Sequence, residues 1–149
     1  RGESVLNGLQ AFNLPVDTWV FVHDAARPCV TKDNLMHLLQ VIESSDVDGA
    51  LLAQPMTDTV KWVNEEGIIE RTLDRRRCWR AQTPQVFRAG PLIQALQKDP
   101  ASFTDEASAM EAVSARIKVV EGSANNMKVT HPEDVALVKK LISDLGEQL

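Results

Sequence analysis

The sequence is poor in the features that mark several large classes of protein. It has only two cysteines, Cys29 and Cys78, with no CxxC motif and no Cys/His cluster, so neither a disulfide framework nor a zinc site is expected. No apolar run reaches the roughly 18–20 residues that a membrane span needs, and no signal-peptide pattern is present. We therefore expect a cytoplasmic protein with reduced cysteines and no membrane partner.

An excess of cationic residues is also missing. The chain has 16 Lys and Arg against 21 Asp and Glu, which gives a net charge of −5. Nucleic-acid binding depends on a basic face that neutralises phosphates, so no nucleic-acid partner is expected. A single bound nucleotide needs only a few local cations and remains compatible with this balance.

What is present suits one soluble domain. The 149 residues are 44% hydrophobic and 25% charged, which is ordinary globular usage and enough for a substantial core. Repeats, low-complexity tracts and linkers are lacking. We therefore treat residues 1–149 as one domain.

Buried strands alternate with amphipathic helices along the chain. Short continuous apolar runs at 19–22 and 49–53 are typical of strands that are covered on both faces of a parallel sheet. Further strands are expected at 117–120 and 127–129, and residues 79–87 have a mixed pattern. Helices are expected at 4–12, from Thr31 as N-cap to Ile42, at 91–98, from Thr104 as a helix cap, and at 132–145. This alternation predicts an α/β doubly wound sheet.

One segment has a different pattern. Residues 59–63 and 68–73 flank the turn sequence 64–67, which predicts a β-hairpin. Lys61, Glu70 and Arg71 give these strands charged residues that a buried strand would not carry. We expect residues 59–73 to form an arm that projects from the domain.

The first candidate site follows the first buried strand, where ligands of open α/β sheets bind. There, Asp24 and Arg27 could together hold a cation or hydroxyl and an anion. A structural pair that ties down the loop is an equally good interpretation of this spacing. His23, taken alone, is better explained as a loop histidine that makes hydrogen bonds than as a catalytic residue.

Other candidates have weaker local signals. Thr59 could present a hydroxyl, although residues 58–61 also suit an ordinary strand start. The arginines at 75–77 could form an anion site, because guanidinium groups match phosphate oxygens, or a solvated run of charge. Thr104 suits a helix cap, and Lys128, just before a helix start, could reach a phosphate.

Taken together, the motifs resemble one enzyme family. They are Ser4-Val5, HDAARP at 23–28, DT.K at 58–61, DR at 74–75, QTPQ.F at 82–87, TDEASA at 104–109 and V.G...N.KVT.PED at 120–134. In this order they resemble 2-C-methyl-D-erythritol 4-phosphate cytidylyltransferases from residue 1 to about 145. The resemblance implies a Rossmann-like nucleotidyltransferase fold, a homodimer that exchanges β-arms, and a Mg²⁺-dependent reaction with CTP.

The resemblance also implies roles for individual residues. Two residues match catalytic positions: Lys128 at the reacting phosphates, and Arg75, which is expected to come from the partner subunit. Six match substrate-binding positions: Ser4 near the cytosine, Asp24 and Arg27 in the polyol-phosphate and nucleotide site, Thr59 and Thr83 around the substrate phosphate, and Thr104. No protein metal ligand is implied, because Mg²⁺ is expected to bind mainly through substrate phosphates.

The chain departs from the family pattern in one respect. The family begins with a glycine-rich loop that carries an arginine and a lysine for the CTP triphosphate, and this sequence has no such loop. We therefore expect the chain to be the C-terminal part of the domain. We further expect it to be inactive alone and to leave a sheet edge unpaired.

The expected reaction needs no protein nucleophile, and no Ser-His-Asp or activated Cys arrangement is evident. A polyol phosphate oxygen would attack the α-phosphorus of CTP in line, and pyrophosphate would leave. Two alternatives remain: a ribitol-5-phosphate cytidylyltransferase, and a non-catalytic nucleotide-binding module. A sugar-nucleotide transferase that uses UTP or GTP is disfavoured by the HDAARP and NMKVT motifs.

Overall fold

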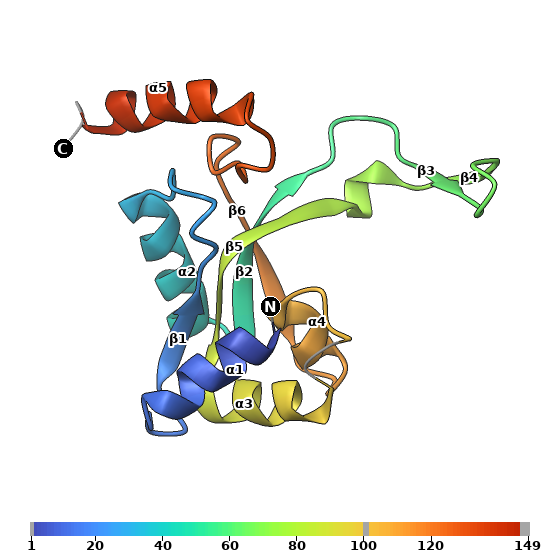
Figure 1. Cartoon of the computed structure of the whole chain (residues 1–149). Helices are drawn as coiled ribbons and strands as arrows, with labels where there is room; N and C mark the ends of the chain where they lie inside the picture. The colour runs from blue at the N-terminus through green and yellow to red at the C-terminus, as the bar shows by residue number, and fades with distance from the viewer. Residues whose placement is uncertain (1, 100–101, 147–149) are drawn as a thin grey trace.

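The structure, a computed structural model, describes residues 2–99 and 102–146. Residues 1, 100, 101 and 147–149 of the expected domain lie outside the described residues. Within the described ranges, the fold is a mixed four-stranded sheet with helices on both faces and a separate two-stranded hairpin (Figure 1). The α/β prediction is therefore confirmed.

The sheet is mixed, whereas a parallel sheet was predicted. Its order is β1 (Trp19–Val22), β5 (Trp79–Arg88), β2 (Gly49–Pro55) and β6 (Ile117–Glu121). β2 and β6 are parallel, but β5 is antiparallel to both β1 and β2. The reason is connectivity: the chain leaves the sheet through β2, passes through the arm, and returns through β5 in the opposite direction (Figure 1).

Helices cover both faces because the central strands are apolar on both sides. On one face, α2 (Lys32–Ser44) packs Leu38 and Ile42 against Leu52 of β2. On the other, α1 (Gly2–Ala11), α3 (Ala89–Lys98) and α4 (Glu106–Glu111) surround Leu51 and Phe87. This confirms the prediction of a strand at 49–53 that is buried on both faces.

One predicted helix cap is confirmed and another is wrong. Thr31 caps α2 by accepting a hydrogen bond from the Asn34 amide. α4, however, is capped by Asp105 and not by Thr104, because Asp105 lies three residues before Ser108 and completes a capping box with it. α5 (Asp134–Gly146) begins two residues later than predicted, whereas α1 and α3 each begin two residues earlier.

The strand predicted at 127–129 is wrong. That segment is extended, but its main-chain bond to the loop after β1, from Val129 N to Ala26 O, does not continue into a ladder. A single bond of this kind ties the segment to that loop without adding a strand to the sheet.

The arm is confirmed as a projecting hairpin. β3 (Lys61–Val63) and β4 (Ile69–Thr72) pair antiparallel, and a 3₁₀ turn (Arg75–Arg77) follows before β5 (Figure 1). Gly67 has a φ of +79°, which is the left-handed conformation that a hairpin turn requires. All residues of β3 and β4 are exposed. As for membranes, none of the helices in the described ranges combines the length and apolarity of a bilayer span.

Candidate active site

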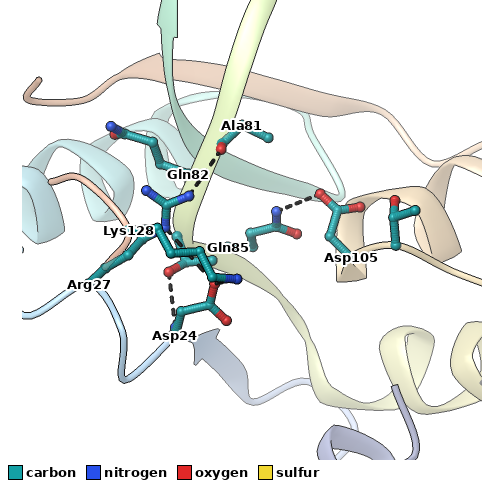
Figure 2. A pocket seen from close by; sticks show the side chains of 9 residues that line it. Asp24, Arg27, Ala81, Gln82, Gln85, Asp105 and Lys128 are labelled. Carbon is teal, nitrogen blue, oxygen red and sulfur yellow. Dashed lines mark hydrogen bonds and ion pairs between the residues drawn. The ribbon is translucent and has the colours of Figure 1, made fainter. Parts of the chain in front are cut away.

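A pocket of about 160 Å³ lies where the loop after β1 meets β5, α4 and the segment before α5. It brings together five of the eight residues that the resemblance singled out: Asp24, Arg27, Thr83, Thr104 and Lys128. Figure 2 shows Asp24, Arg27 and Lys128 gathered together, with Asp105 on the far side of Gln85. Residues up to 104 positions apart in the chain therefore line one hollow.

Two cations lie around one carboxylate in this pocket. Lys128 Nζ is 3.1 Å from Asp24 Oδ2, and Arg27 Nε is 4.0 Å from the same oxygen. The Arg27 side chain is 13% exposed, and its guanidinium donates to the carbonyl oxygen of Asn126 at 2.8 Å. With two cations against one carboxylate, the cluster is locally positive and suited to a phosphate.

The loop after β1 is held by the Thr83 hydroxyl. Thr83 Oγ1 accepts a hydrogen bond from the Asp24 amide at 3.0 Å and lies 2.9 Å from His23 Nδ1. His23 Nε2 lies 2.9 Å from the carbonyl oxygen of Arg27. His23 is thus a loop histidine that makes hydrogen bonds, which confirms the interpretation preferred from the sequence. The Thr83 hydroxyl, which the resemblance places near the substrate phosphate, is engaged with the loop in this structure.

Lys128 is held beside that loop by its neighbours. Asn126 is fully buried and donates from Nδ2 to the carbonyl oxygen of Thr83 at 2.8 Å. The Asp134 carboxylate accepts hydrogen bonds from the Thr130 and His131 amides, both at 2.9 Å. These bonds, that from Thr130 first, lower the pKa of Asp134 below its ordinary value.

Sequence reasoning missed the buried amides of this site. Gln82, Gln85 and Asn126 are each less than 10% exposed. Gln85 and Asn126 donate to the pocket residues Asp105 and Thr83, and Gln82 donates to the carbonyl oxygen of Ser123. The two glutamines of QTPQ.F, just before the apolar Val86 and Phe87, were the available signal. A glutamine inside a buried strand needs partners, and those partners lie next to the site.

Three candidates lie outside this pocket. Ser4 is exposed on α1, Thr59 is exposed before β3, and Arg75 is exposed on the turn after β4. Arg75 donates to the carbonyl oxygen of Thr57, at the base of the arm.

The arginine run on the arm is already partly paired. Arg76 Nη2 is 2.8 Å from Asp74 Oδ2, and the hydrogen bond from Arg76 lowers the pKa of Asp74. Arg76 is therefore a less available anion ligand than its neighbours in the run.

The carboxylates that line this pocket are the side chains that could take part in a metal site. Among the described residues, no group of three or more His, Cys, Asp or Glu side chains could hold a metal. Asp105 already accepts from the Ser108 amide and from Gln85. Asp24 lies near both Lys128 and Arg27 and is a carboxylate of this pocket that could contribute to a Mg²⁺ site, since Mg²⁺ commonly takes one or two carboxylates together with substrate phosphates.

Comparison with known proteins identifies the family. The family model for 2-C-methyl-D-erythritol 4-phosphate cytidylyltransferase matches residues 1–144. The chain belongs to this family. Cytidylyltransferases of this family include a protein from Mannheimia succiniciproducens that is 47% identical over 146 residues, which cover 96% of this chain and 62% of that protein. One from Pectobacterium atrosepticum is 45% identical over 148 residues, covering 97% of this chain and 61% of the relative.

Solved structures of the family have the same fold. The cytidylyltransferase structure from Francisella tularensis superposes with a TM-score of 0.84 at 39% identity, covering 95% of this chain and 67% of that one. The chain spans about 62% of the length of the Mannheimia relative. The similarity that shows the family therefore extends over most of this chain but over only part of the length of each relative.

Proposed function

We propose that this protein transfers a cytidylyl group from CTP to 2-C-methyl-D-erythritol 4-phosphate, giving 4-diphosphocytidyl-2-C-methyl-D-erythritol and pyrophosphate. The observation that carries the proposal is the cluster of Asp24, Arg27 and Lys128 at the pocket, on a chain that belongs to this cytidylyltransferase family. The reactants are two anions that repel each other, and cations fixed in one hollow favour their approach.

The proposed reaction is an in-line displacement without a covalent enzyme intermediate. A phosphate oxygen of the polyol phosphate forms a bond to the α-phosphorus of CTP, and the bond from that phosphorus to the bridging oxygen breaks. The released pyrophosphate carries the electron pair. Arg27, held by main-chain carbonyls, would bind a phosphate in a fixed position. Lys128, whose side chain is 45% exposed, could turn from Asp24 towards the charge that grows in the transition state.

Mg²⁺ is a further part of the proposal. Asp24 is the residue of this pocket that would hold it, together with substrate phosphates. When bound, the ion would neutralise phosphate oxygens and so lower the repulsion between the two substrates.

A homodimer with exchanged arms is the second part. The arm exposes Trp62 (51%), Ile68 (58%) and Ile69 (58%), which are large apolar side chains that an interface would cover. Thr59 begins the arm and Arg75 follows it in the 3₁₀ turn after β4, so arm exchange would carry them to the pocket of the partner. A cytoplasmic location agrees with the two free cysteines of the described residues.

The test compares acceptors under identical conditions. Pyrophosphate release from CTP is measured with the full-length gene product and either 2-C-methyl-D-erythritol 4-phosphate or ribitol 5-phosphate, with UTP and GTP as nucleotide controls. We expect a clear preference in kcat/KM for CTP and the methylerythritol phosphate. Preference for ribitol 5-phosphate would establish the alternative transferase, and absence of turnover with every pair would favour a non-catalytic binding module.

A further inference from the structure

Gln85 is a polar side chain in the middle of the sheet. It lies on β5 opposite Val22 of β1 and Leu51 of β2, and it is only 1% exposed. An amide buried without partners would be costly, so the hydrogen bonds of Gln85 indicate the role of its side chain.

Both ends of the Gln85 amide bond to the start of α4. Nε2 donates to Asp105 Oδ2 at 2.8 Å, and Oε1 accepts from the Ala107 amide at 2.8 Å. The other oxygen of Asp105, Oδ1, accepts from the Ser108 amide at 2.8 Å. Gln85 therefore clamps the first turn of α4 to the central strand through two bonds. We call this arrangement the Gln85–Asp105 clamp.

The clamp lies at one end of the pocket. Figure 2 shows Asp105 on one side of Gln85 and Arg27 and Lys128 on the other. Thr104, the residue before Asp105, also lines the pocket. Thr104 immediately precedes Asp105, so the bond that fixes Asp105 also restricts the position of the Thr104 backbone. The place of Thr104 in the pocket is thus tied to Gln85 through Asp105.

We infer that Gln85 is a positioning residue for the phosphorylated polyol. Through Asp105 it holds Thr104 at the distance from Arg27 and Lys128 that lets one small molecule place a phosphate at the cations and its hydroxyl groups at Thr104. This inference rests on the proposed function and adds a residue to it. It concerns the acceptor and not CTP, because an acceptor must span both ends of the pocket.

The test exchanges the donor and acceptor of the clamp. In Gln85→Glu, a carboxylate faces the Asp105 carboxylate. In Asp105→Asn, the asparagine oxygen can still accept from the Ser108 amide, but its NH₂ group then faces the NH₂ group of Gln85. Two donors oppose each other, so the bond to Gln85 is lost. The double variant restores complementarity, because the introduced asparagine donates to the introduced glutamate, which still accepts from the Ala107 amide. We expect each single change to raise the KM for 2-C-methyl-D-erythritol 4-phosphate by about tenfold or more, since small misplacements of bound reactants are costly.

The double variant is the decisive test of the clamp. It should recover most of the lost acceptor affinity, a non-additivity that residues in contact show. The KM for CTP should change little in all three variants. Gln97→Glu, an exposed change of the same chemistry on α3, is the matched control and should behave as wild type.

Thermal unfolding of each variant separates positioning from stability. A lower melting temperature with an unchanged acceptor KM would mean that the clamp is only structural, and this would overturn the inference, as would a double variant no better than the singles. If either of these two outcomes is found while the wild type is active, the inference about Gln85 is wrong and the proposed function still stands. An inactive wild type overturns the proposed function and the inference together.

Discussion

Arg27 and Lys128 face the same hollow with different freedom. The Arg27 guanidinium is largely buried and donates to the carbonyl oxygens of Asn126 and Ala81. Lys128 is nearly half exposed and meets Asp24 at 3.1 Å. At the residue scale, the site therefore combines a fixed cation with a more exposed one that pairs with Asp24, and the proposed function assigns both to phosphate groups.

Asp134 gives a prediction about pH. Hydrogen bonds from the Thr130 and His131 amides lower its pKa, so its folded-state value lies below the ordinary 3.8. A depressed carboxylate stabilises the fold above its unfolded pKa, and this contribution is lost as pH falls through the folded pKa. Wild type should therefore exceed Asp134→Asn in stability by a constant amount above about pH 5, and by less as the pH falls further.

Denaturant unfolding from about pH 7 to about pH 2 measures this difference. Asp144→Asn, an exposed change on the same helix, is the matched control. A difference between wild type and Asp134→Asn that stays constant through the acid range would contradict the assignment.

Sequence reasoning predicts some of these residues better than others. Asp24, Arg27 and Lys128 were predicted because each follows a strand-like segment or belongs to a recognisable motif, and the structure places all three at one pocket. Gln85 and Asn126 were missed because their partners are distant in the chain. The bond from Gln85 reaches a residue 20 positions away, and that from Asn126 reaches one 43 positions away.

At the scale of elements, β2 is the structural centre of the domain. Its residues from Gly49 to Ala53 are all buried, and they alternate between the core under α2 and the core under α1, α3 and α4. The continuous apolar run predicted this burial. It could not predict the direction of β5, because strand direction depends on how the arm returns the chain.

The attachment of α2 can be tested by one core truncation. Leu38 is fully buried between α2 and the sheet, so Leu38→Ala leaves a cavity and should cost about 2–5 kcal/mol in the free energy of unfolding. Urea unfolding measures this cost. Met36→Ala on the exposed side of α2 is the control and should change stability by less than about 1 kcal/mol. Equal effects of the two changes would contradict the packing of this helix.

At the scale of the whole molecule, the proposed arm exchange would make each pocket depend on two chains. The hairpin was predicted from its turn sequence and charged strands, and the structure confirms that it projects. Whether a second copy receives it could not be derived from one sequence, because an exposed apolar arm identifies an interface but not its occupant.

Mixing two inactive variants tests arm exchange. If Arg75 serves the pocket of the partner, a Lys128→Ala subunit paired with an Arg75→Ala subunit contains one site with both residues intact. After subunit exchange, the mixture should recover about a quarter of wild-type activity, because half of the dimers are mixed and each has one complete site. Activity no higher than the mean of the two separate variants would contradict action across subunits.

The most direct test of the account is the turnover of Lys128→Ala in the full-length protein with CTP and 2-C-methyl-D-erythritol 4-phosphate. Lys140→Ala, an exposed lysine change on α5, is the control and should retain wild-type kcat. Loss of a charge-stabilising group of this kind should lower kcat by about 10²–10³-fold, or about 2.7–4 kcal/mol. A loss of less than about tenfold would remove Lys128 from the mechanism and contradict the assignment of this pocket as the active site.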